Sequence, residues 1–351
     1  MATTEEEILG RTREVEKIVR FLDELSAGHR SLVIAGDAGM GKTTLWRAGV
    51  AAAERRAYQV CRCRPGEAET EMAFAALIDL LEEIPEDALE ALPGPQRRAL
   101  EVALLRREPQ GPSVDPRAVA RAVVGILETL AEAGPVVVAV DDVQWLDPSS
   151  ARVLQFVFRR IKDAPIGVLA SVRVGTPVGV IEPLSEAHST ELLVGPLSLG
   201  AIDRLIRTRI DPKVPRPLLV RIHEVSGGNP FFALEIARGL ERRGAKPRPG
   251  DTLPIPASLG DLVRERLTAL GPDARPTLLV AAACSRPTVA LVRAAVGDDA
   301  QEALDHAISM AVIEPVTDAI EFTHPLLASV LYADASGSER REAHARLALV
   351  P

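Results

Sequence analysis

The sequence is poor in cysteine, lysine and long apolar runs, and each shortage excludes a class of protein. Three cysteines in 351 residues are too few for a disulfide framework. Cys61 and Cys63 are separated only by Arg62, which is too close for a metal pair of the usual C-x₂-C type, and Cys284 stands alone. We therefore expect reduced thiols that hold neither a metal nor a disulfide.

No apolar run approaches the length needed to span a bilayer, so we expect no membrane partner. The first residues, 1–7, are acidic and lack the basic and apolar regions of a secretory signal, which predicts a cytoplasmic location. The formal net charge of −8 argues against a chain that grips nucleic acid through a basic surface. Because the basic residues are overwhelmingly arginine, Lys42 stands out.

The strongest signal in the chain is residues 36–43, Gly-Asp-Ala-Gly-Met-Gly-Lys-Thr, which match the phosphate-binding pattern G-x-x-x-x-G-K-[ST]. Residues 31–35 before the loop have strand character, and residues 44–55 after it read as a helix with one weak point at Gly49. Strand, glycine loop and helix in this order are the context that the motif requires. A glycine-rich turn without a ligand is the alternative, and both flanks disfavour it.

This loop predicts how the phosphates of a nucleotide are held. Its glycines let the backbone wrap a phosphate chain, and the amides at the helix start point at the anion. Lys42 would reach the β- and γ-phosphates, and the hydroxyl of Thr43 would ligate Mg²⁺. The predicted phosphate-binding residues are Gly36, Asp37, Ala38, Gly39, Met40, Gly41, Lys42, Thr43 and Thr44.

Residues 135–142 give the second strong signal, because a continuous apolar run ends there in Asp141 and Asp142. Such a run is typical of a strand buried on both faces of a parallel sheet. Since ligands of these sheets lie at the carboxyl ends of the strands, both carboxylates are expected beside the glycine loop. Asp141 would hold Mg²⁺, and Asp142 would position or deprotonate the attacking water. The alternative is an exposed acidic turn.

Further strands are expected at residues 58–63, 166–173 and 191–194, and strands alternate with helices over roughly 190 residues. This pattern predicts an α/β P-loop NTPase fold with a five-stranded parallel sheet. Arg173 at a strand tip could sense the γ-phosphate or could be an ordinary surface arginine, and its spacing leaves both open. Asp147, which precedes a proline, is more typical of a helix N-cap than of a catalytic group.

The rest of the chain is predicted to be helical apart from one hairpin. Asn229 and Pro230 read as an N-cap and the first position of a helix. The proline-rich residues 245–256 read as a linker between domains. Helices around a hairpin in residues 311–322 predict a winged-helix-like domain, and Thr323 is expected to cap the helix that follows.

The predicted order is therefore an α/β domain, an all-α lid and a winged-helix-like domain. The expected bounds are a nucleotide-binding domain over residues 1–197, a helical lid with its linker over 198–250, a winged-helix-like domain over 251–337 and the start of a further helical region over 338–351.

Three motifs together resemble the ATPase core of the large ATP-binding LuxR-type transcriptional regulators. These proteins belong to the STAND class of signal-transduction ATPases, which is related to AAA+ and NB-ARC proteins. The motifs are the loop at 36–43, Asp-Asp-Val-Gln-Trp-Leu-Asp at 141–147 and Gly-Gly-Asn-Pro-Phe-Phe-Ala-Leu-Glu at 227–235. The resemblance covers nearly the whole chain, and the string at 141–147 is its most specific part.

The resemblance adds roles at a nucleotide to residues that also have ordinary structural explanations. Gly10 and Arg11 match a motif whose glycine and arginine lie against the adenine and ribose, and Arg173 matches the arginine that reads the terminal phosphate. Pro230 would contact the base from the lid. His324 resembles the histidine of the Met-His-Asp motif, which holds the β-phosphate of ADP, although threonine and proline replace its neighbours.

The implied function is an ATP/ADP switch with slow Mg²⁺-dependent hydrolysis. Lys42, Asp142 and Arg173 would be its catalytic residues, and Thr43 and Asp141 its metal ligands. Members of the family continue into a helical-repeat sensor region and a DNA-binding helix-turn-helix. The resemblance therefore implies an amino-terminal fragment of a longer regulator or an unusually short relative, with self-association or contact with a sensor region, and DNA binding only through that helix-turn-helix.

Other nucleotide-dependent functions remain open: an active AAA+-type or kinase-type ATPase, or a scaffold with a structural nucleotide. A GTPase is disfavoured because the base-reading pattern Asn-Lys-x-Asp is absent. An ABC-type ATPase is disfavoured because Ser226-Gly227-Gly228 follows Asp141, whereas the ABC signature precedes the acidic strand.

Overall fold

The computed structural model describes residues 8–108, 115–161, 164–175, 179, 189–210, 214–242, 259–284, 286–297, 299–316 and 319–350. The chain divides into two compact units, one formed by residues 1–37, 41–65 and 69–195, the other by residues 38–40, 66–68 and 196–351. Each unit is described by itself. The proline-rich linker predicted at residues 245–256 lies outside the described residues, and the four domain ranges stay predictions.

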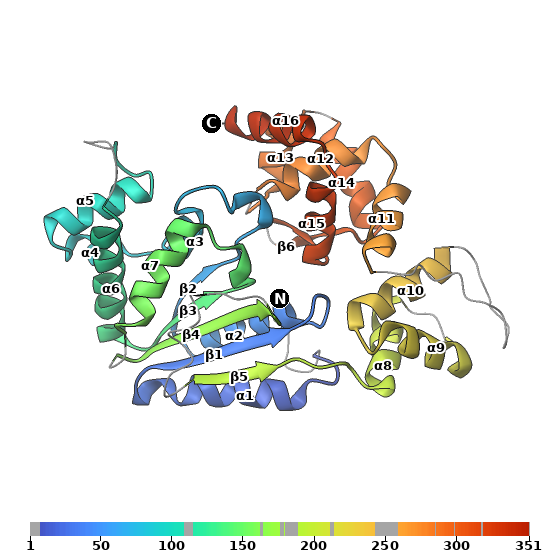
Figure 1. Cartoon of the computed structure of the whole chain (residues 1–351), viewed down its shortest axis with the longest axis horizontal. Coiled ribbons are helices and arrows are strands. Elements are labelled where there is room, and N and C mark those ends of the chain that lie inside the picture. The colour runs from blue at the N-terminus through green and yellow to red at the C-terminus, as the bar shows by residue number, and fades with distance from the viewer. Residues whose placement is uncertain are drawn as a thin grey trace. The chain divides into compact units, whose positions relative to one another are not determined.

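A five-stranded parallel sheet forms the centre of the first unit, in the order β2-β3-β4-β1-β5 (Figure 1). Its strands are β1 (Arg30–Gly36), β2 (Gln59–Cys63), β3 (Val136–Val140), β4 (Ile166–Arg173) and β5 (Ser189–Leu193). Every neighbouring pair runs in parallel. Strand β3 is buried along its whole length, as its unbroken apolar sequence requires. The predicted parallel sheet is confirmed.

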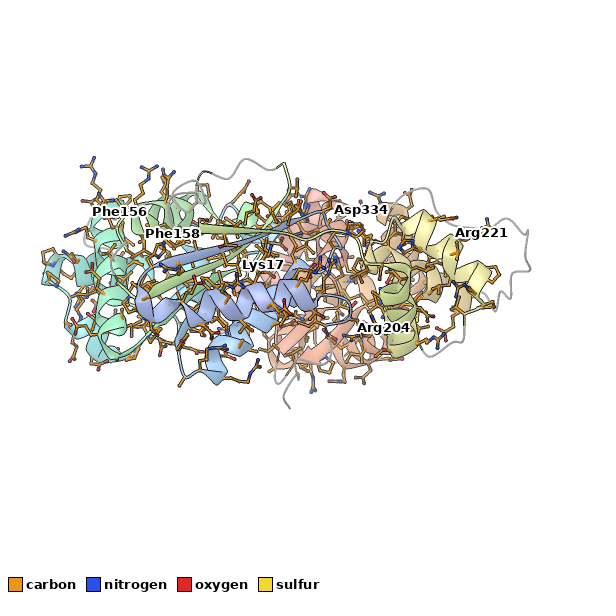
Figure 2. The ribbon with its side chains drawn as sticks, turned by 90° about the horizontal axis from the view of Figure 1, so that it is seen from below. Lys17, Phe156, Phe158, Arg204, Arg221 and Asp334 are labelled. Atoms are coloured by element: carbon orange, nitrogen blue, oxygen red, sulfur yellow. The ribbon has the colours of Figure 1, made fainter. Side chains whose placement is uncertain are left out.

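Helices cover both faces of this sheet. On one face lie α1 (Thr12–Asp23) and α2 (Lys42–Arg55), and Figure 2 shows α1 running along the sheet, with Lys17 on it. The other face is covered by α3 (Ala75–Leu80), α6 (Pro116–Ala133) and α7 (Pro148–Phe158), with α4 (Glu86–Glu90) and α5 (Gly94–Ala103) packed beside α6.

Two glycines allow α1 and α2 to approach the sheet closely. A Cβ atom at Gly49 of α2 would lie 2.7 Å from a methyl carbon of Leu169 on β4. A Cβ atom at Gly167 would lie 2.9 Å from the ring of Phe21 on α1, and 2.7 Å from a methyl carbon of Leu25 just after that helix. The expected weak point in α2 is therefore a packing requirement, because any larger residue at Gly49 would push the helix away from the sheet.

The carboxylate of Asp147 starts two helices. As predicted, it caps α7 by accepting hydrogen bonds from the backbone N–H groups of Ser149 and Ser150, at 3.1 and 2.9 Å. It also accepts from the N–H groups of Phe74 and Ala76 at the start of α3, at 2.9 and 3.3 Å. The second pair of bonds joins segments about seventy residues apart.

The second unit is mainly helical. Helices α8 (Leu199–Ile210), α9 (Arg216–Ser226) and α10 (Pro230–Arg242) share one apolar core. A second core lies among α11 (Leu259–Ala269), α12 (Ala274–Ala282), α13 (Val289–Val296), α14 (Ala300–Ser309), α15 (Pro325–Ala333), α16 (Gly337–Ala348) and the antiparallel strands β6 (Ile313–Val316) and β7 (Ala319–Phe322). The predicted hairpin is present, and the winged-helix arrangement stays a prediction.

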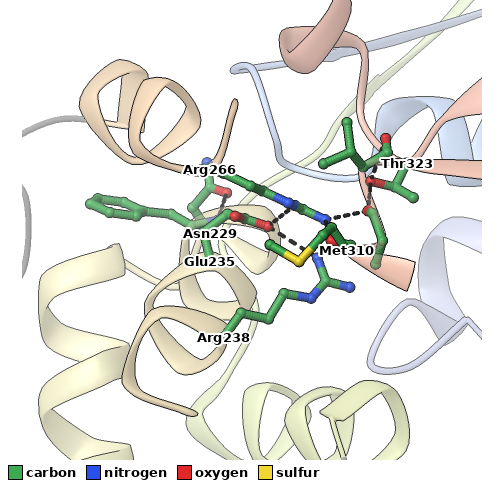
Figure 3. Close-up of polar contacts among 9 residues, drawn as sticks. Asn229, Glu235, Arg238, Arg266, Met310 and Thr323 are labelled. Carbon is green, nitrogen blue, oxygen red and sulfur yellow. Dashed lines mark hydrogen bonds and ion pairs between the residues drawn. The ribbon is translucent and has the colours of Figure 1, made fainter. Parts of the chain in front are cut away.

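A buried ion pair connects these two helical groups (Figure 3). Arg266 on α11 donates through Nη1 to Oε1 of Glu235 on α10, and both side chains are fully buried. Arg238 Nη1 donates to the same oxygen at 3.0 Å. The Nη2 atom of Arg266 donates to the carbonyl oxygens of Met310, at 3.2 Å, and Ala311. The charge of the glutamate is thus compensated inside the protein.

The predicted helix starts in this unit have two outcomes. Asn229 caps α10, because its Oδ1 accepts from the N–H of Phe232 at 3.1 Å. The hydroxyl of Thr323 donates to the carbonyl oxygen of Ala311 at 2.7 Å, a long-range bond that the sequence did not indicate. The capping role of Thr323 stays a prediction. Among the described helices, none has both the length and the apolar character that crossing a bilayer would require.

Candidate functional site

The glycine loop connects β1 to α2 with the backbone geometry that its glycines permit. Gly39 and Gly41 have φ angles of 80° and 93°, which side-chain-bearing residues rarely adopt. Helix α2 begins at Lys42, immediately after the second of these glycines. The unpaired N–H groups of its first turn therefore lie at the end of the loop, where an anion would be stabilised.

Lys42 is buried at the start of α2, although lysine is rarely buried. Its Nζ donates to the carbonyl oxygen of Asp37 at 3.1 Å. Burial lowers the pKa of Lys42 below its ordinary value; the charge of Asp142 opposes this, and the charge of Arg173 adds to it. A phosphate beside this amine would supply the counter-charge that favours its protonated form.

Asp141 follows β3 directly, and its side chain is almost fully buried. Its Oδ1 accepts a short hydrogen bond, 2.5 Å, from the hydroxyl of Ser171. The side chain of Thr43 is also hydrogen-bonded to it, and Arg64 Nε lies 3.6 Å from Oδ2. Burial, followed by the charge of Asp142, raises the pKa of Asp141 above its usual value. A cation at this position would offset both effects.

Asp142 has a left-handed backbone, with φ 49° and ψ 56°, a conformation that aspartate adopts more readily than most side-chain-bearing residues. Two neighbours hold it: its N–H donates to Ser171 Oγ at 2.8 Å, and its Oδ1 accepts from Gln144 Nε2 at 2.8 Å. Oε1 of Gln144 accepts from the backbone N–H of Arg173 at 3.3 Å, and the Arg173 guanidinium lies 5.4 Å from the ring centre of Trp145.

The structure thus brings together Lys42, Thr43, Asp141, Asp142 and Arg173, which the sequence assigned to phosphate, metal and hydrolysis. They come from the carboxyl ends of β3 and β4 and from the start of the helix after β1, all within the first unit. Asp141 is buried, so it is not part of an exposed acidic turn, and the roles of these five residues stay predictions.

Sequence reasoning missed three side chains at the same place: Ser171, Gln144 and Arg64. Ser171 is a polar residue between the apolar Ala170 and Val172 of β4, which is a usable signal. Gln144 lies inside the motif at 141–147 but was given no role. Arg64 follows β2 directly, and only the strand order shows that it comes close to Asp141.

The remaining predicted residues of the first unit lie at its amino terminus and on α2. Arg11 is buried; its Nη2 donates to the carbonyl oxygen of Gly195 at 2.7 Å, and its Nη1 donates to Glu14 at 3.0 Å. Gly10 has a φ of 75°, which favours glycine. Thr44 is exposed on the first turn of α2.

Pro230 and His324 belong to the second unit. Pro230 begins α10, and the next residue, Phe231, stacks on the imidazole of His324 with the ring centres 3.8 Å apart. Asn229, just before Pro230, donates through Nδ2 to the carbonyl oxygen of Ala38 at 2.9 Å, within the same unit.

The residues present fit Mg²⁺. A cluster of three or more histidine, cysteine or acidic side chains that could hold a metal is absent from the described residues. Mg²⁺ needs no such cluster, because it is typically bound by one or two carboxylates, waters and the phosphates of a substrate. The hydrogen-bonded pair of the Thr43 hydroxyl and the Asp141 carboxylate supplies the protein's share of that set.

Comparison with known proteins gives three findings. Residues 7–169 match the family model described as an AAA ATPase domain. An uncharacterized protein of Rhizobium meliloti is 27% identical over 391 residues, an alignment that covers 97% of this chain and 36% of that protein. A STAND protein (Signal Transduction ATPase with Numerous Domains) with a tetratricopeptide repeat sensor, from Pyrococcus horikoshii, has a similar crystal structure. The TM-score is 0.55 at 16% identity, and the match covers 93% of this chain and 44% of that one.

The chain therefore spans less than half the length of both of these proteins. At 16% identity the archaeal structure shows a shared fold, and the family match over residues 7–169 covers the glycine loop, both acids and the first half of β4.

Proposed function

We propose that this chain, a P-loop NTPase with an AAA-type ATPase domain, is an ATP/ADP-binding switch that hydrolyses ATP slowly with Mg²⁺. The observation that carries the proposal is the convergence of Lys42, Thr43, Asp141, Asp142 and Arg173 at one edge of the first unit's sheet. A buried amine, a hydroxyl–carboxylate pair, a second carboxylate and an arginine are the groups that phosphoryl transfer requires.

The roles of these residues follow from their chemistry. The N–H groups at the start of α2 and the amine of Lys42 hold the β- and γ-phosphates. Thr43 and Asp141 would hold Mg²⁺, which would neutralise phosphate charge. Arg173 stabilises charge on the γ-phosphate.

Asp142 orients a water molecule and takes its proton as the water oxygen attacks the γ-phosphorus. The bond from that phosphorus to the β–γ bridging oxygen breaks, and the bonding electron pair leaves with ADP. The products are ADP and inorganic phosphate.

A switch is favoured over a fast enzyme because the chain continues into a second unit of comparable size. A nucleotide shifts a conformational equilibrium only through its differential affinity for the two states. By the resemblance to STAND ATPases, Gly10 and Arg11 would contact the adenosine, and Pro230 and His324 would make contacts that differ between ATP and ADP.

The proposed context is the regulatory ATPase module of a longer bacterial transcription regulator. The resemblance of the three motifs to LuxR-type regulators supports it, and so does the greater length of the Rhizobium relative. In that context, DNA binding would belong to a helix-turn-helix outside this sequence, and the partner of the module would be a sensor region or a second copy.

Isothermal titration calorimetry tests the proposal. Lys42→Ala is expected to abolish binding of ATP and ADP, because it removes the cation that faces the phosphates. Lys17→Ala is the matched control, because Lys17 is exposed on α1 (Figure 2) and should leave affinity unchanged. Unchanged affinity in Lys42→Ala would show that the loop does not bind nucleotide.

Turnover separates the switch from the alternatives. Asp142→Ala is expected to keep nucleotide affinity while hydrolysis slows about 100-fold or more, as befits a group that acts only during the reaction. Wild-type turnover of many per second without a partner would instead favour a motor or kinase. Bound ADP that cannot be exchanged would favour a scaffold.

A further inference from the structure

Gln144 connects two parts of the candidate site, the turn that carries Asp142 and the end of β4 that carries Arg173. Its side-chain amide donates to Asp142 Oδ1 at 2.8 Å and accepts from the backbone N–H of Arg173 at 3.3 Å. One amide therefore bridges the turn after β3 and the end of β4.

The two partners fix the orientation of this amide. A carboxylate only accepts hydrogen bonds, and a backbone N–H only donates them, so the NH₂ group of Gln144 must face Asp142 and its oxygen must face Arg173. Glutamine is the residue type that offers both functions at this reach, since glutamate would place like charges together and asparagine is one methylene shorter.

The bridge lies where the regular pairing between β3 and β4 has ended, although β4 still pairs with β1 as far as Arg173. The last residues in register between β3 and β4 are Val140 and Ala170. Beyond them, side chains replace the ladder: Ser171 Oγ accepts from the N–H of Asp142, and Gln144 joins the carboxylate of Asp142 to Arg173. Asp142 has the left-handed backbone that aspartate tolerates better than most side-chain-bearing residues.

The same turn also faces the side chain of Arg173. The guanidinium group lies 5.4 Å from the ring centre of Trp145, the residue that follows Gln144. The arginine is thus contacted through its backbone by Gln144 and through its charge by Trp145. A shift of Arg173 would therefore be transmitted to the carboxylate of Asp142.

We infer that Gln144 is a positioning residue that holds the Asp142 carboxylate in place relative to Arg173. The inference rests on the proposed function, in which these two residues act on the attacking water and the γ-phosphate. In this inference Gln144 contacts neither the attacking water nor the γ-phosphate, and it acts through Asp142. Loss of the bridge should therefore impair hydrolysis and spare nucleotide binding.

Single-turnover hydrolysis of Mg²⁺-ATP, with calorimetry in parallel, tests this inference. Gln144→Leu, which keeps the size and removes both hydrogen bonds, is expected to slow hydrolysis about 10- to 100-fold while the Kd for ATP stays within about twofold. Gln144→Glu, which keeps the shape and places a charge against Asp142, should also be slow. Gln155→Leu is the matched control, because Gln155 lies on α7 and bonds the carbonyl oxygen of Gly179, away from the site.

A double-mutant cycle separates positioning from a general structural effect. If Gln144 acts through the carboxylate of Asp142, then Asp142→Asn and the pair Asp142→Asn with Gln144→Leu should hydrolyse ATP at the same rate. A further loss in the pair, equal to that in the single Gln144→Leu variant, would overturn the inference. Gln144→Glu provides the test if the leucine variant does not fold.

Failure of the proposed function can be distinguished from failure of the inference about Gln144. A wild-type chain that neither binds nor hydrolyses ATP overturns the proposed function and this inference with it. A wild-type chain that hydrolyses ATP, alongside a Gln144→Leu variant that is equally fast, overturns the inference alone.

Discussion

Asp141 in the first unit and Glu235 in the second are both buried carboxylates, but their surroundings differ. Asp141 is held mainly by hydroxyl groups, those of Ser171 and Thr43, while the guanidinium of Arg64 lies 3.6 Å away. The carboxylate of Asp142 follows it in sequence and adds a like charge. Burial, followed by this like charge, raises the pKa of Asp141, so its ionised form is disfavoured until a cation binds.

Glu235 has the opposite environment. Arg266 and Arg238 both donate to its Oε1, and Arg266 also donates to two backbone carbonyls. Its charge is compensated by the protein itself, and the two helices that carry the pair are joined. A buried carboxylate without full compensation thus indicates a ligand site, whereas a compensated one indicates a structural joint.

Breaking the ion pair between Arg266 and Glu235 should have the largest effect on the free energy of unfolding. Arg266→Met leaves Glu235 buried with only Arg238 to oppose its charge, and is expected to cost about 3 kcal/mol. Urea unfolding monitored by circular dichroism measures it. Arg264→Met is the matched control: Arg264 is on the same helix but half exposed in its pair with Asp334, so its loss should change the midpoint little.

If the cost arises from an uncompensated Glu235, then removing both residues of the ion pair should cost less stability than removing Arg266 alone. Replacing both residues, by Arg266→Met with Glu235→Met, should restore part of the lost stability, because no uncompensated carboxylate remains. Equal midpoints for Arg266→Met and Arg264→Met would show that burial of the ion pair carries no special weight.

Removing the carboxylate of Asp141, at the candidate metal site, should change stability less, and should increase it. Because burial raises the pKa of Asp141, the folded chain binds this proton more tightly than the unfolded chain does. The resulting stability is present below the unfolded pKa and is lost as pH rises through the folded pKa. Ionised Asp141 therefore costs stability at pH 7, and Asp141→Asn should raise the Tm in the absence of ligand.

Differential scanning fluorimetry across pH checks this sign. The Tm advantage of Asp141→Asn should be present at pH 7 and shrink as pH falls through the folded pKa toward the ordinary aspartate range. Glu235→Gln should lower the Tm under the same conditions, since it breaks a compensated pair. With Mg²⁺-ATP, wild type should have a higher Tm than Asp141→Asn, because only wild type gains the stabilisation of a bound metal. If ligand-free Asp141→Asn has a lower Tm than wild type at pH 7, the stated difference between Asp141 and Glu235 is wrong.

Thiol labelling gives the smallest effect and reports on each unit separately. Burial raises the pKa of Cys61 to about 12 and raises the pKa of Cys63 well above its usual value, so neither thiol should be reactive at pH 8. Cys284 in the second unit is only partly buried and should react first. Mass spectrometry should show faster labelling of Cys284 in Arg266→Met, with Cys61 and Cys63 unchanged. Faster labelling of all three would indicate that the substitution also loosens the first unit.

The sequence predicted the elements whose signals are local. The apolar run before Asp141, the glycine pattern before Lys42 and the Asp–Pro pair at residue 147 each lie within a few adjacent residues, and the corresponding strand, loop and cap are present. The meeting of Lys42 and Asp141 was expected because the carboxyl ends of parallel strands share one edge. The roles assigned to these residues stay predictions.

Contacts between distant segments could not be predicted in the same way. Ser171 reaches Asp141 across 30 residues, and Arg266 reaches Glu235 across 31 residues. Such pairings depend on strand order and helix packing, and local periodicity encodes neither. Gln144 could be predicted only in part. Its position in a specific motif was visible in the sequence, but its hydrogen bonds to Asp142 and Arg173 depend on β3 and β4 lying side by side.

The carboxylate shared by α3 and α7 has a consequence for how the first unit assembles. Because Asp147 lies next to α7, it can cap that helix alone, whereas the start of α3 is satisfied only once the α7 segment has arrived. Opening of α7 therefore also uncaps α3, so the amides of Phe74 and Ala76 should exchange hydrogen whenever those of Ser149 and Ser150 do. Helix α7 also follows directly on the turn that carries Asp142 and Gln144. The ordering of that turn is thus coupled to a helix seventy residues earlier in the chain.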